Sequence, residues 1–231
     1  MSEDYPLEKL ASLPSFYHPA ASPSGDEVAV YYDGSGRNEL YLVDPATGEQ
    51  TQVSDGNVPR DARYPFRWAP SGDRLYFHQD RDGDEQNDIM AIDRDGAVEA
   101  VVENEGQTIL SDVSEDGRYL LFISDAGQQM NLHEHDRETG TTTQLTEYRQ
   151  PVRGGVYAPG ADRVAYNTNE SDNLDNQDVY VAEVERHLDG DEHAELTDAR
   201  NLNIGEEGAE AGASDFGPDG DQLLLSVNTS D

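Results

Sequence analysis

The chain has 231 residues, 35% of them hydrophobic, and its 49 acidic residues outnumber 15 Lys and Arg to give a formal net charge of −34. Such a charge repels polyanions, so nucleic acid and membranes are excluded as expected partners, and no apolar run is long enough to span a bilayer. The acidic N-terminus has no signal-peptide pattern and cysteine is absent, so we expect a cytoplasmic protein without disulfides or thiolate chemistry.

A short turn rich in Pro, Ser, Asp and Gly recurs along the chain, and a run of apolar residues follows each copy. Proline sets φ early in such a turn and glycine supplies the positive φ that reverses the chain. The glycine of the turn, or the residue in its place, is Gly25, Gly72, Gly117, Ala161 and Gly220, at spacings of 47, 45, 44 and 59 residues. Because Ala161 replaces glycine in the fourth copy, we expect a shifted turn there.

A second element, an apolar strand that ends in an acid, follows each of the first four turns. Its copies span residues 40–44, 89–93, 131–136 and 179–183, and a polar strand such as 141–146 closes the unit. Four short strands per unit, at a period in the mid-forties, predict an all-β fold, a β-propeller with four-stranded antiparallel blades. A short segment over residues 7–13 is the one place where a helix is expected.

We expect one propeller domain over residues 1–231 with about four and a half blades, the last of them incomplete. The blades are expected at about 16–56, 64–106, 108–148, 152–198 and, in part, 212–231. Two acidic insertions, at 185–195 and 205–212, lengthen the fourth spacing and are expected to be solvated surface loops.

The last apolar strand, residues 223–227, has no partner strand after it in the sequence. A strand edge with unpaired backbone groups is prone to association. We therefore expect either that the chain is a fragment of a longer product or that self-association through this strand completes the sheet.

The sharpest local cluster of candidate ligands is acidic and surrounds Gly83. Its carboxylates, Asp80, Asp82, Asp84 and Asp88, are the oxygen ligands that Ca²⁺ prefers. The spacing lacks the distal Glu of an EF-hand loop, so the segment is interpreted as an acidic hairpin loop of an acid-rich protein rather than as an ion site. Residues 169–178 form a looser version of the same pattern. No metal-binding residue is assigned.

Two other groups of side chains invite a functional interpretation. His133 and His135 are two apart on an expected strand, so they share a face, yet no third ligand accompanies them. Arg60, Arg63 and Arg67 lie among aromatic residues, where they could meet an acidic peptide terminus or pair with nearby carboxylates. The first pair is interpreted as surface or interblade histidines, and the arginines as partners of acids.

No segment has the pattern of a catalytic nucleophile. Ser214 follows Gly212 but precedes Asp215 and Phe216, so a Gly-x-Ser-x-Gly elbow is absent. No spacing of Asp, His and Ser indicates a triad. No catalytic or cofactor-binding residue is assigned, and no cofactor is predicted.

The choice of charged residues is itself unusual. Lys9 is the only lysine among the 15 basic residues. Abundant carboxylates with arginine in place of lysine resemble the proteomes of extreme halophiles, in which a Debye length of about 3 Å at 1 M salt screens acid–acid repulsion.

The turns resemble the TolB-like type of propeller repeat, and no Trp-Asp dipeptide of a WD-repeat occurs. More specifically, the chain resembles the N-terminal propeller of prolyl oligopeptidase-family serine peptidases. The segments that carry the resemblance are residues 16–25 (FYHPAASPSG), 36–41 (GRNELY), 66–73 (FRWAPSGD) and 77–80 (FHQD). The resemblance implies a non-catalytic role, shielding the active site of an α/β-hydrolase domain missing from this chain and selecting peptide substrates by size.

Two alternatives stay open at this point. One is a free-standing TolB-like scaffold that binds a protein or peptide. The other is a Ca²⁺-dependent binding or carbohydrate-processing propeller, for which the acidic cluster around Gly83 would supply the ligands.

Overall fold

The computed structural model describes residues 13–80, 86–187 and 193–228, and within these ranges it contains strands and no helix. The all-β prediction is confirmed. The helix expected over residues 7–13 lies outside the described residues, apart from Leu13. Among the described residues, no helix has the length and apolarity needed to cross a membrane. The chain divides into two compact units, Met1–Gln79 with Met90–Glu99, and Asp80–Ile89 with Ala100–Asp231.

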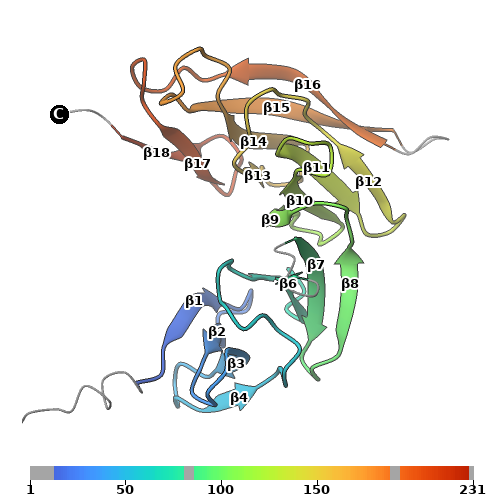
Figure 1. Cartoon of the computed structure of the whole chain (residues 1–231), viewed down its shortest axis with the longest axis vertical. Helices are drawn as coiled ribbons and strands as arrows, with labels where there is room; N and C mark the ends of the chain where they lie inside the picture. Colours follow the sequence, from blue (N-terminus) through green and yellow to red (C-terminus); the bar gives the residue numbers. More distant parts are fainter. Residues whose placement is uncertain (1–12, 81–85, 188–192, 229–231) are drawn as a thin grey trace, which may run out of the picture. The chain divides into compact units, whose positions relative to one another are not determined.

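The first two sheets have four strands each, in sequence order (Figure 1). The first contains β1 (Phe16–Ala21), β2 (Val28–Tyr32), β3 (Glu39–Val43) and β4 (Gln50–Gln52). The second contains β5 (Arg67–Trp68), β6 (Arg74–Asp80), β7 (Asn87–Asp93) and β8 (Val98–Val102). The boundary between the two units runs through this second sheet.

The remaining strands form two further four-stranded sheets and a two-stranded one, all antiparallel. The third sheet contains β9 (Thr108–Val113), β10 (Tyr119–Ser124), β11 (Asn131–Asp136) and β12 (Thr141–Gln144). The fourth contains β13 (Gly155–Tyr157), β14 (Arg163–Thr168), β15 (Asp178–His187) and β16 (His193–Asn201). The fifth contains β17 (Ala211–Phe216) and β18 (Leu223–Val227). This is the predicted set of four-stranded antiparallel blades, with an incomplete last blade.

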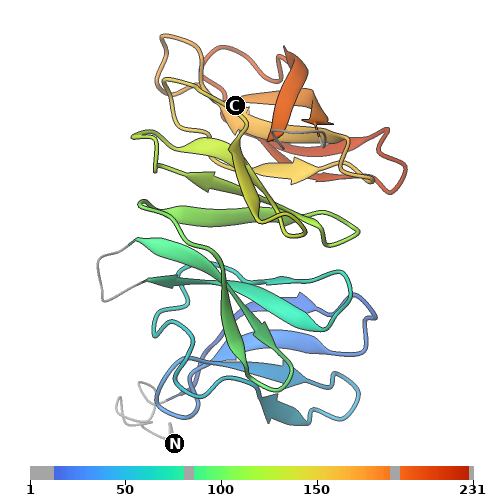
Figure 2. The ribbon, with the colours of Figure 1, turned by 90° about the vertical axis from the view of Figure 1, so that its right-hand side faces the viewer.

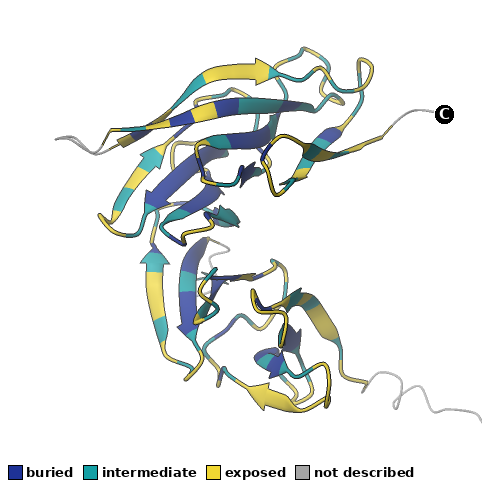
Figure 3. Cartoon of the chain, turned by 180° about the vertical axis from the view of Figure 1, so that it is seen from behind, coloured by how far each residue is buried: buried dark blue, intermediate teal, exposed yellow. Residues whose placement is uncertain are grey.

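Successive sheets pack face to face within each unit, as the layers in Figure 2 show. In the first unit Tyr31 of β2 meets Phe66, before β5, edge to face, with ring centroids 4.9 Å apart. In the second unit Leu121 and Leu132 of the third sheet share a core with Tyr166 of the fourth. Each such side chain contributes about 1.5–3 kcal/mol through burial. The central strands are therefore largely buried, while outer strands such as β4 and β16 are mostly exposed (Figure 3).

The repeated turn has one hydrogen-bonding pattern in all five sheets. In the first copy the Gly25 amide donates to the Ser22 carbonyl (2.9 Å), and the Ser22 amide donates to the Glu27 carbonyl (2.8 Å). Gly25 has a φ of +76°, which glycine adopts without the steric cost of a Cβ. The equivalent first bonds, amide to carbonyl, are Gly72 to Ala69, Gly117 to Ser114, Ala161 to Ala158 and Gly220 to Gly217.

The fourth turn keeps this register, so the prediction of a shifted turn is wrong. Ala161 donates to the Ala158 carbonyl at 2.9 Å and itself adopts a φ of +56°, and the preceding Gly160 has a φ of +81°. A left-handed conformation costs a residue with a Cβ about 1–2 kcal/mol. The Ala161 methyl group is buried in the core of the second unit, which offsets part of that cost. The substitution changes the backbone conformation and leaves the position of the turn unchanged.

In the first three sheets the acid at the end of the third strand holds the next turn, whereas in the fourth sheet Glu183 lies inside β15, which continues to His187. Asp44 Oδ1 accepts a hydrogen bond from the Ala46 amide (2.7 Å), while the Gly48 amide donates to the Asp44 carbonyl (2.8 Å). Asp93 and Asp136 accept hydrogen bonds from the amides two residues further on, at 2.9 Å each. Short polar side chains favour turns because they bond to nearby backbone in this way. The acid and glycine of the repeat are thus explained by local geometry.

One of the two expected acidic loops is largely strand. β15 continues to His187 and β16 begins at His193, with Glu185 opposite Glu195 in the register. Val184 and Ala194 alternate with these polar residues and are buried in the core. An alternating pattern is typical of a half-buried strand, and here it extends the hairpin where net charge alone indicated a loop. Residues 188–192 lie outside the described part of the chain.

Candidate functional site

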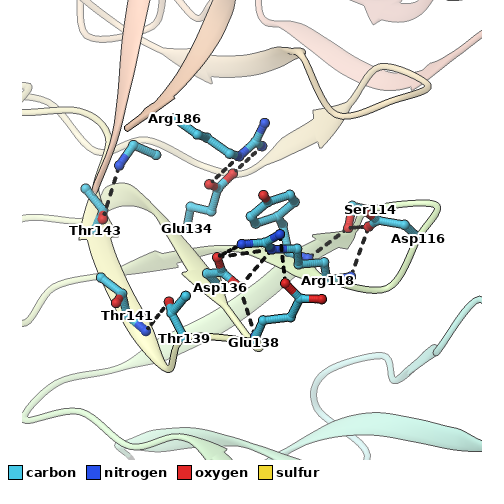
Figure 4. A network of polar contacts seen from close by, with 12 residues as sticks. Ser114, Asp116, Arg118, Glu134, Asp136, Glu138, Thr139, Thr141, Thr143 and Arg186 are labelled. Carbon is cyan, nitrogen blue, oxygen red and sulfur yellow. Dashed lines mark hydrogen bonds and ion pairs between the residues drawn. The ribbon is translucent and has the colours of Figure 1, made fainter. Parts of the chain in front are cut away.

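A small hollow of the second unit lies between the third and fourth sheets and has a cavity volume of about 20 Å³. One wall comes from β10, β11, β12 and the β11–β12 turn, and the other from the adjoining ends of β15 and β16 (Figure 4). Its lining residues are Tyr119, Glu134, Asp136, Thr139, Thr141, Thr143, Arg186, His193 and Ala194.

A buried ion pair between the two sheets forms the centre of this hollow. Arg186 donates two parallel hydrogen bonds to Glu134, from Nε to Oε1 (2.8 Å) and from Nη2 to Oε2 (2.7 Å). Tyr157 donates its hydroxyl to Glu134 Oε2 at 2.6 Å, and the Arg186 guanidinium lies over the Tyr119 ring at 3.9 Å from its centroid. Glu134 is only 3% exposed, so these partners replace the water it has lost.

Electrostatics at this pair follow from burial and contact. Burial raises the pKa of Tyr157 well above its ordinary value, and the negative charge of Glu134 raises it further. Burial opposes the charge on Arg186, but the hydrogen bonds and charge of Glu134 outweigh that effect and raise its pKa. Tyr157 therefore stays a neutral donor and Arg186 stays a cation, which is the arrangement that stabilises a buried carboxylate.

A second arginine organises the rim of the hollow. Arg118 donates to both carboxylate oxygens of Asp136, at 2.6–3.1 Å, and pairs with Glu138 at 2.8 Å. Partial burial would raise the pKa of Asp136, but the bonds from Arg118 prevail and lower it. Nearby, the Ser114 hydroxyl donates to Asp116 at 2.7 Å and lowers the pKa of that carboxyl group. Figure 4 shows this network beside the buried pair.

The chemistry available to this arrangement is non-covalent: its side chains bind one another and hold the third and fourth sheets together. Its arginines and carboxylates satisfy one another, so no group drawn in Figure 4 is placed as a free base beside a nucleophile. The Thr143 hydroxyl oxygen accepts a hydrogen bond from the Ala194 amide at 3.4 Å, which ties the two walls together. Sequence reasoning missed this site. The available signal was Glu134 itself, an acid in the expected third strand of a blade, which needs a cationic partner when that strand is buried.

The acidic cluster predicted as a possible Ca²⁺ site is described only in part. Asp82 and Asp84 lie outside the described residues. Asp80 ends β6, and Asp88 lies in β7, where it is buried and its Oδ1 accepts a hydrogen bond from the Asn104 amide at 3.1 Å. In the looser segment 169–178, Asn169 donates to the Asn173 carbonyl at 2.8 Å. Asp88 in β7 and Asn169 in its loop thus have structural roles.

His133 and His135 are buried in β11. His133 stacks on Phe122 with centroids 5.3 Å apart, and its Nδ1 is 2.9 Å from the Asn131 carbonyl oxygen. His135 Nδ1 is 2.9 Å from the Thr142 hydroxyl. Burial lowers the pKa of both imidazoles, which are therefore neutral packing residues near pH 7.

The remaining residues singled out in the sequence are the arginine group and Ser214. Arg63 lies over the Tyr64 ring at 5.3 Å, and Arg67 opens β5, opposite Tyr76. The pairing of these arginines with acids stays a prediction. Ser214 lies inside β17, at an irregularity of its pairing with β18, and a nucleophile elbow requires a turn between a strand and a helix.

The fold defines the class of this protein as a β-propeller, because four-stranded antiparallel sheets follow one another with a repeated turn. The family model described as the TolB beta propeller domain (PD40) matches residues 8–190, most of the chain. The chain belongs to this family.

The proteins similar to this chain are longer than it is. The uncharacterized protein Atu1656 of Agrobacterium fabrum is 26% identical over 190 residues, which are 81% of this chain and 61% of that relative. The structure of TolB from Acinetobacter baumannii matches 93% of this chain and 52% of its own at a TM-score of 0.66 and 18% identity. The structure of a puromycin-hydrolyzing peptidase of Mycobacterium tuberculosis matches 94% of this chain and 35% of the peptidase chain, at a TM-score of 0.67 and 16% identity. The chain spans less than two thirds of each, and the structural likenesses show the fold alone.

Proposed function

We propose that this chain is the non-catalytic propeller part of a prolyl oligopeptidase-like serine peptidase, where it shields the active site and selects peptide substrates by size. One observation carries the proposal: the match to the Mycobacterium tuberculosis peptidase covers 94% of this chain but 35% of the peptidase. A chain of this kind corresponds to one part of such an enzyme and leaves room for a separate catalytic domain. The sequence segments 16–25 and 66–73 support the same family.

The chemistry of the described residues supports the non-catalytic role. The hollow between the third and fourth sheets is neutralised internally by Arg186 with Glu134 and Arg118 with Asp136. Peptide substrates would be partners of the whole enzyme, reached through an α/β-hydrolase domain outside these 231 residues. Adaptation to high salt is proposed on the basis of the net charge of −34. A cytoplasmic location completes the proposal.

The test begins with the coding sequence that follows Asp231. We expect an α/β-hydrolase domain with a Gly-x-Ser-x-Gly elbow in the same reading frame, and a stop codon there in the intact gene would contradict the proposal. The whole gene product should hydrolyse short chromogenic peptides and leave folded proteins intact. Removing residues 1–231 should relax this size limit, and an unchanged preference for short peptides would argue against a gating role.

A second candidate, a free-standing TolB-like scaffold that binds a protein or peptide, is favoured by the sequence relative. The match covers 61% of Atu1656 with about four sheets of this chain, so the unmatched part of that relative is long enough for further blades. For this candidate we expect the 231-residue chain to form a soluble oligomer with β18 paired across subunits. A monomer that aggregates with rising concentration would contradict it.

A further inference from the structure

The end of the β15–β16 hairpin carries four side chains of metal-binding type on one exposed face. Glu185 and His187 project from β15, and His193 and Glu195 project from β16. All four are exposed, while the alternating Val184 and Ala194 are buried against the third sheet. This alternation points the four polar residues away from the core that Val184 and Ala194 enter, and His193 also borders the hollow between the third and fourth sheets.

The strand register brings these residues together in matched pairs. Glu185 lies directly opposite Glu195, and His187 lies directly opposite His193. The ligand atoms of Glu185, His187 and Glu195 all lie within 4.8 Å of one another. His187 Nε2 is 2.9 Å from Glu195 Oε1, and the rings of His187 and His193 are stacked with centroids 4.7 Å apart.

The pairing of Glu185 with Glu195 and of His187 with His193 across the two strands needs an explanation. Two carboxylates directly across an antiparallel pair repel each other, and the chain already has a net charge of −34. A divalent cation between Glu185 and Glu195 would convert that repulsion into attraction. Strands with buried neighbours also hold ligands more precisely than a loop does.

We propose that Glu185, His187, His193 and Glu195 form a binding site for a divalent transition metal of the zinc class. Imidazole nitrogen suits Zn²⁺, Ni²⁺ and Cu²⁺, whereas Ca²⁺ and Mg²⁺ prefer sites made of oxygen alone. Two histidines and two carboxylates match the four-coordinate preference of Zn²⁺. The ion would join the ends of β15 and β16. The proposal is independent of the peptidase assignment, because it concerns only this hairpin.

The experiment is calorimetric titration of the tag-free 231-residue chain, stripped of metal with a chelator, with Zn²⁺. We expect one Zn²⁺ per chain, and at least a tenfold loss of affinity in the double variant His187→Ala/His193→Ala. Excess Ca²⁺ should not displace the ion. The matched control, Glu206→Gln/Glu207→Gln, removes two exposed carboxylates outside the site and should bind Zn²⁺ as the unmodified chain does.

Two results would overturn the proposal. One is unchanged affinity in the histidine variant, and the other is an equal loss in the glutamate control, which would show diffuse binding to an acidic surface. If the histidine variant fails to fold, Co²⁺ bound to the unmodified chain decides the question. Intense visible absorption of four-coordinate Co²⁺ supports the site, and the weak spectrum of the hydrated ion contradicts it.

Discussion

Glu134 and Arg186 are 52 residues apart in the chain, yet their side chains form a two-point hydrogen-bonded ion pair, at 2.7 and 2.8 Å, between the third and fourth sheets. Tyr157, also in the fourth sheet, donates a further hydrogen bond to the Glu134 carboxylate. The pair therefore links two neighbouring sheets through charge as well as through apolar packing.

Removing Arg186 should strongly destabilise the protein. The variant Arg186→Leu leaves Glu134 buried without its cation, for which a loss of about 3 kcal/mol or more is expected. Urea unfolding, followed by circular dichroism, measures the change. Arg74→Leu is the control, because its partner Glu99 is largely exposed and such pairs contribute about 0–1 kcal/mol. Equal losses in the two variants would show that the buried pair has no special role.

Replacing the glycine of the repeated turn should destabilise the protein through backbone conformation alone. In Gly25→Ala the new Cβ meets no atom within 4 Å, but φ is +76°, so we expect destabilisation of about 1 kcal/mol. Gly127→Ala is the control: its φ is outside the left-handed region and its nearest neighbour is the flexible Gln144 side chain at 3.4 Å. The midpoint of thermal unfolding should be lower for Gly25→Ala than for Gly127→Ala. The reverse order would contradict the explanation of the turn.

Mild acid should destabilise the protein through buried histidine. Burial lowers the pKa of His78 to about 4 from an ordinary 6.5, and the nearby charge of Arg67 acts in the same direction. As pH falls from 6.5 towards 4, the unfolded chain takes up a proton that the folded chain refuses, so stability is lost across that window. Burial shifts the pKa of His133 and His135 in the same direction.

The variant His78→Gln tests this assignment. It should flatten the fall of unfolding free energy between pH 6.5 and 4 by up to about 1.4 kcal/mol per pH unit, the value for one proton. The measurement is a series of urea unfolding curves across the window. A slope equal to that of the unmodified chain would mean that His78 is protonated in the folded state as readily as in the unfolded one.

The net charge of −34 predicts that salt stabilises the fold. Self-repulsion of a highly charged compact state falls as the Debye length shrinks from about 10 Å at 0.1 M to about 3 Å at 1 M. The midpoint of thermal unfolding should therefore rise from dilute buffer to molar KCl. Equal midpoints would exclude adaptation to concentrated salt.

The repeat and its turns could be predicted from the sequence because the interactions that form them are local. The Gly25 amide reaches the Ser22 carbonyl, and the Asp44 carboxylate reaches the Ala46 amide, over two or three residues. Local bonds of this kind depend on neighbouring residue types, which a sequence displays directly. The four-stranded sheets and the period between them followed from these signals.

The tertiary structure alone decided which distant groups meet. The sequence shows Glu134 as an acid in an expected central strand, but its partner Arg186 is specified by how the third sheet packs on the fourth. The acidic segment beyond Val184 forms strand because its alternate residues are buried in the core. The resulting register places His187 opposite His193. Strand register and sheet packing depend on the sum of many weak contacts over long separations, which local composition does not encode.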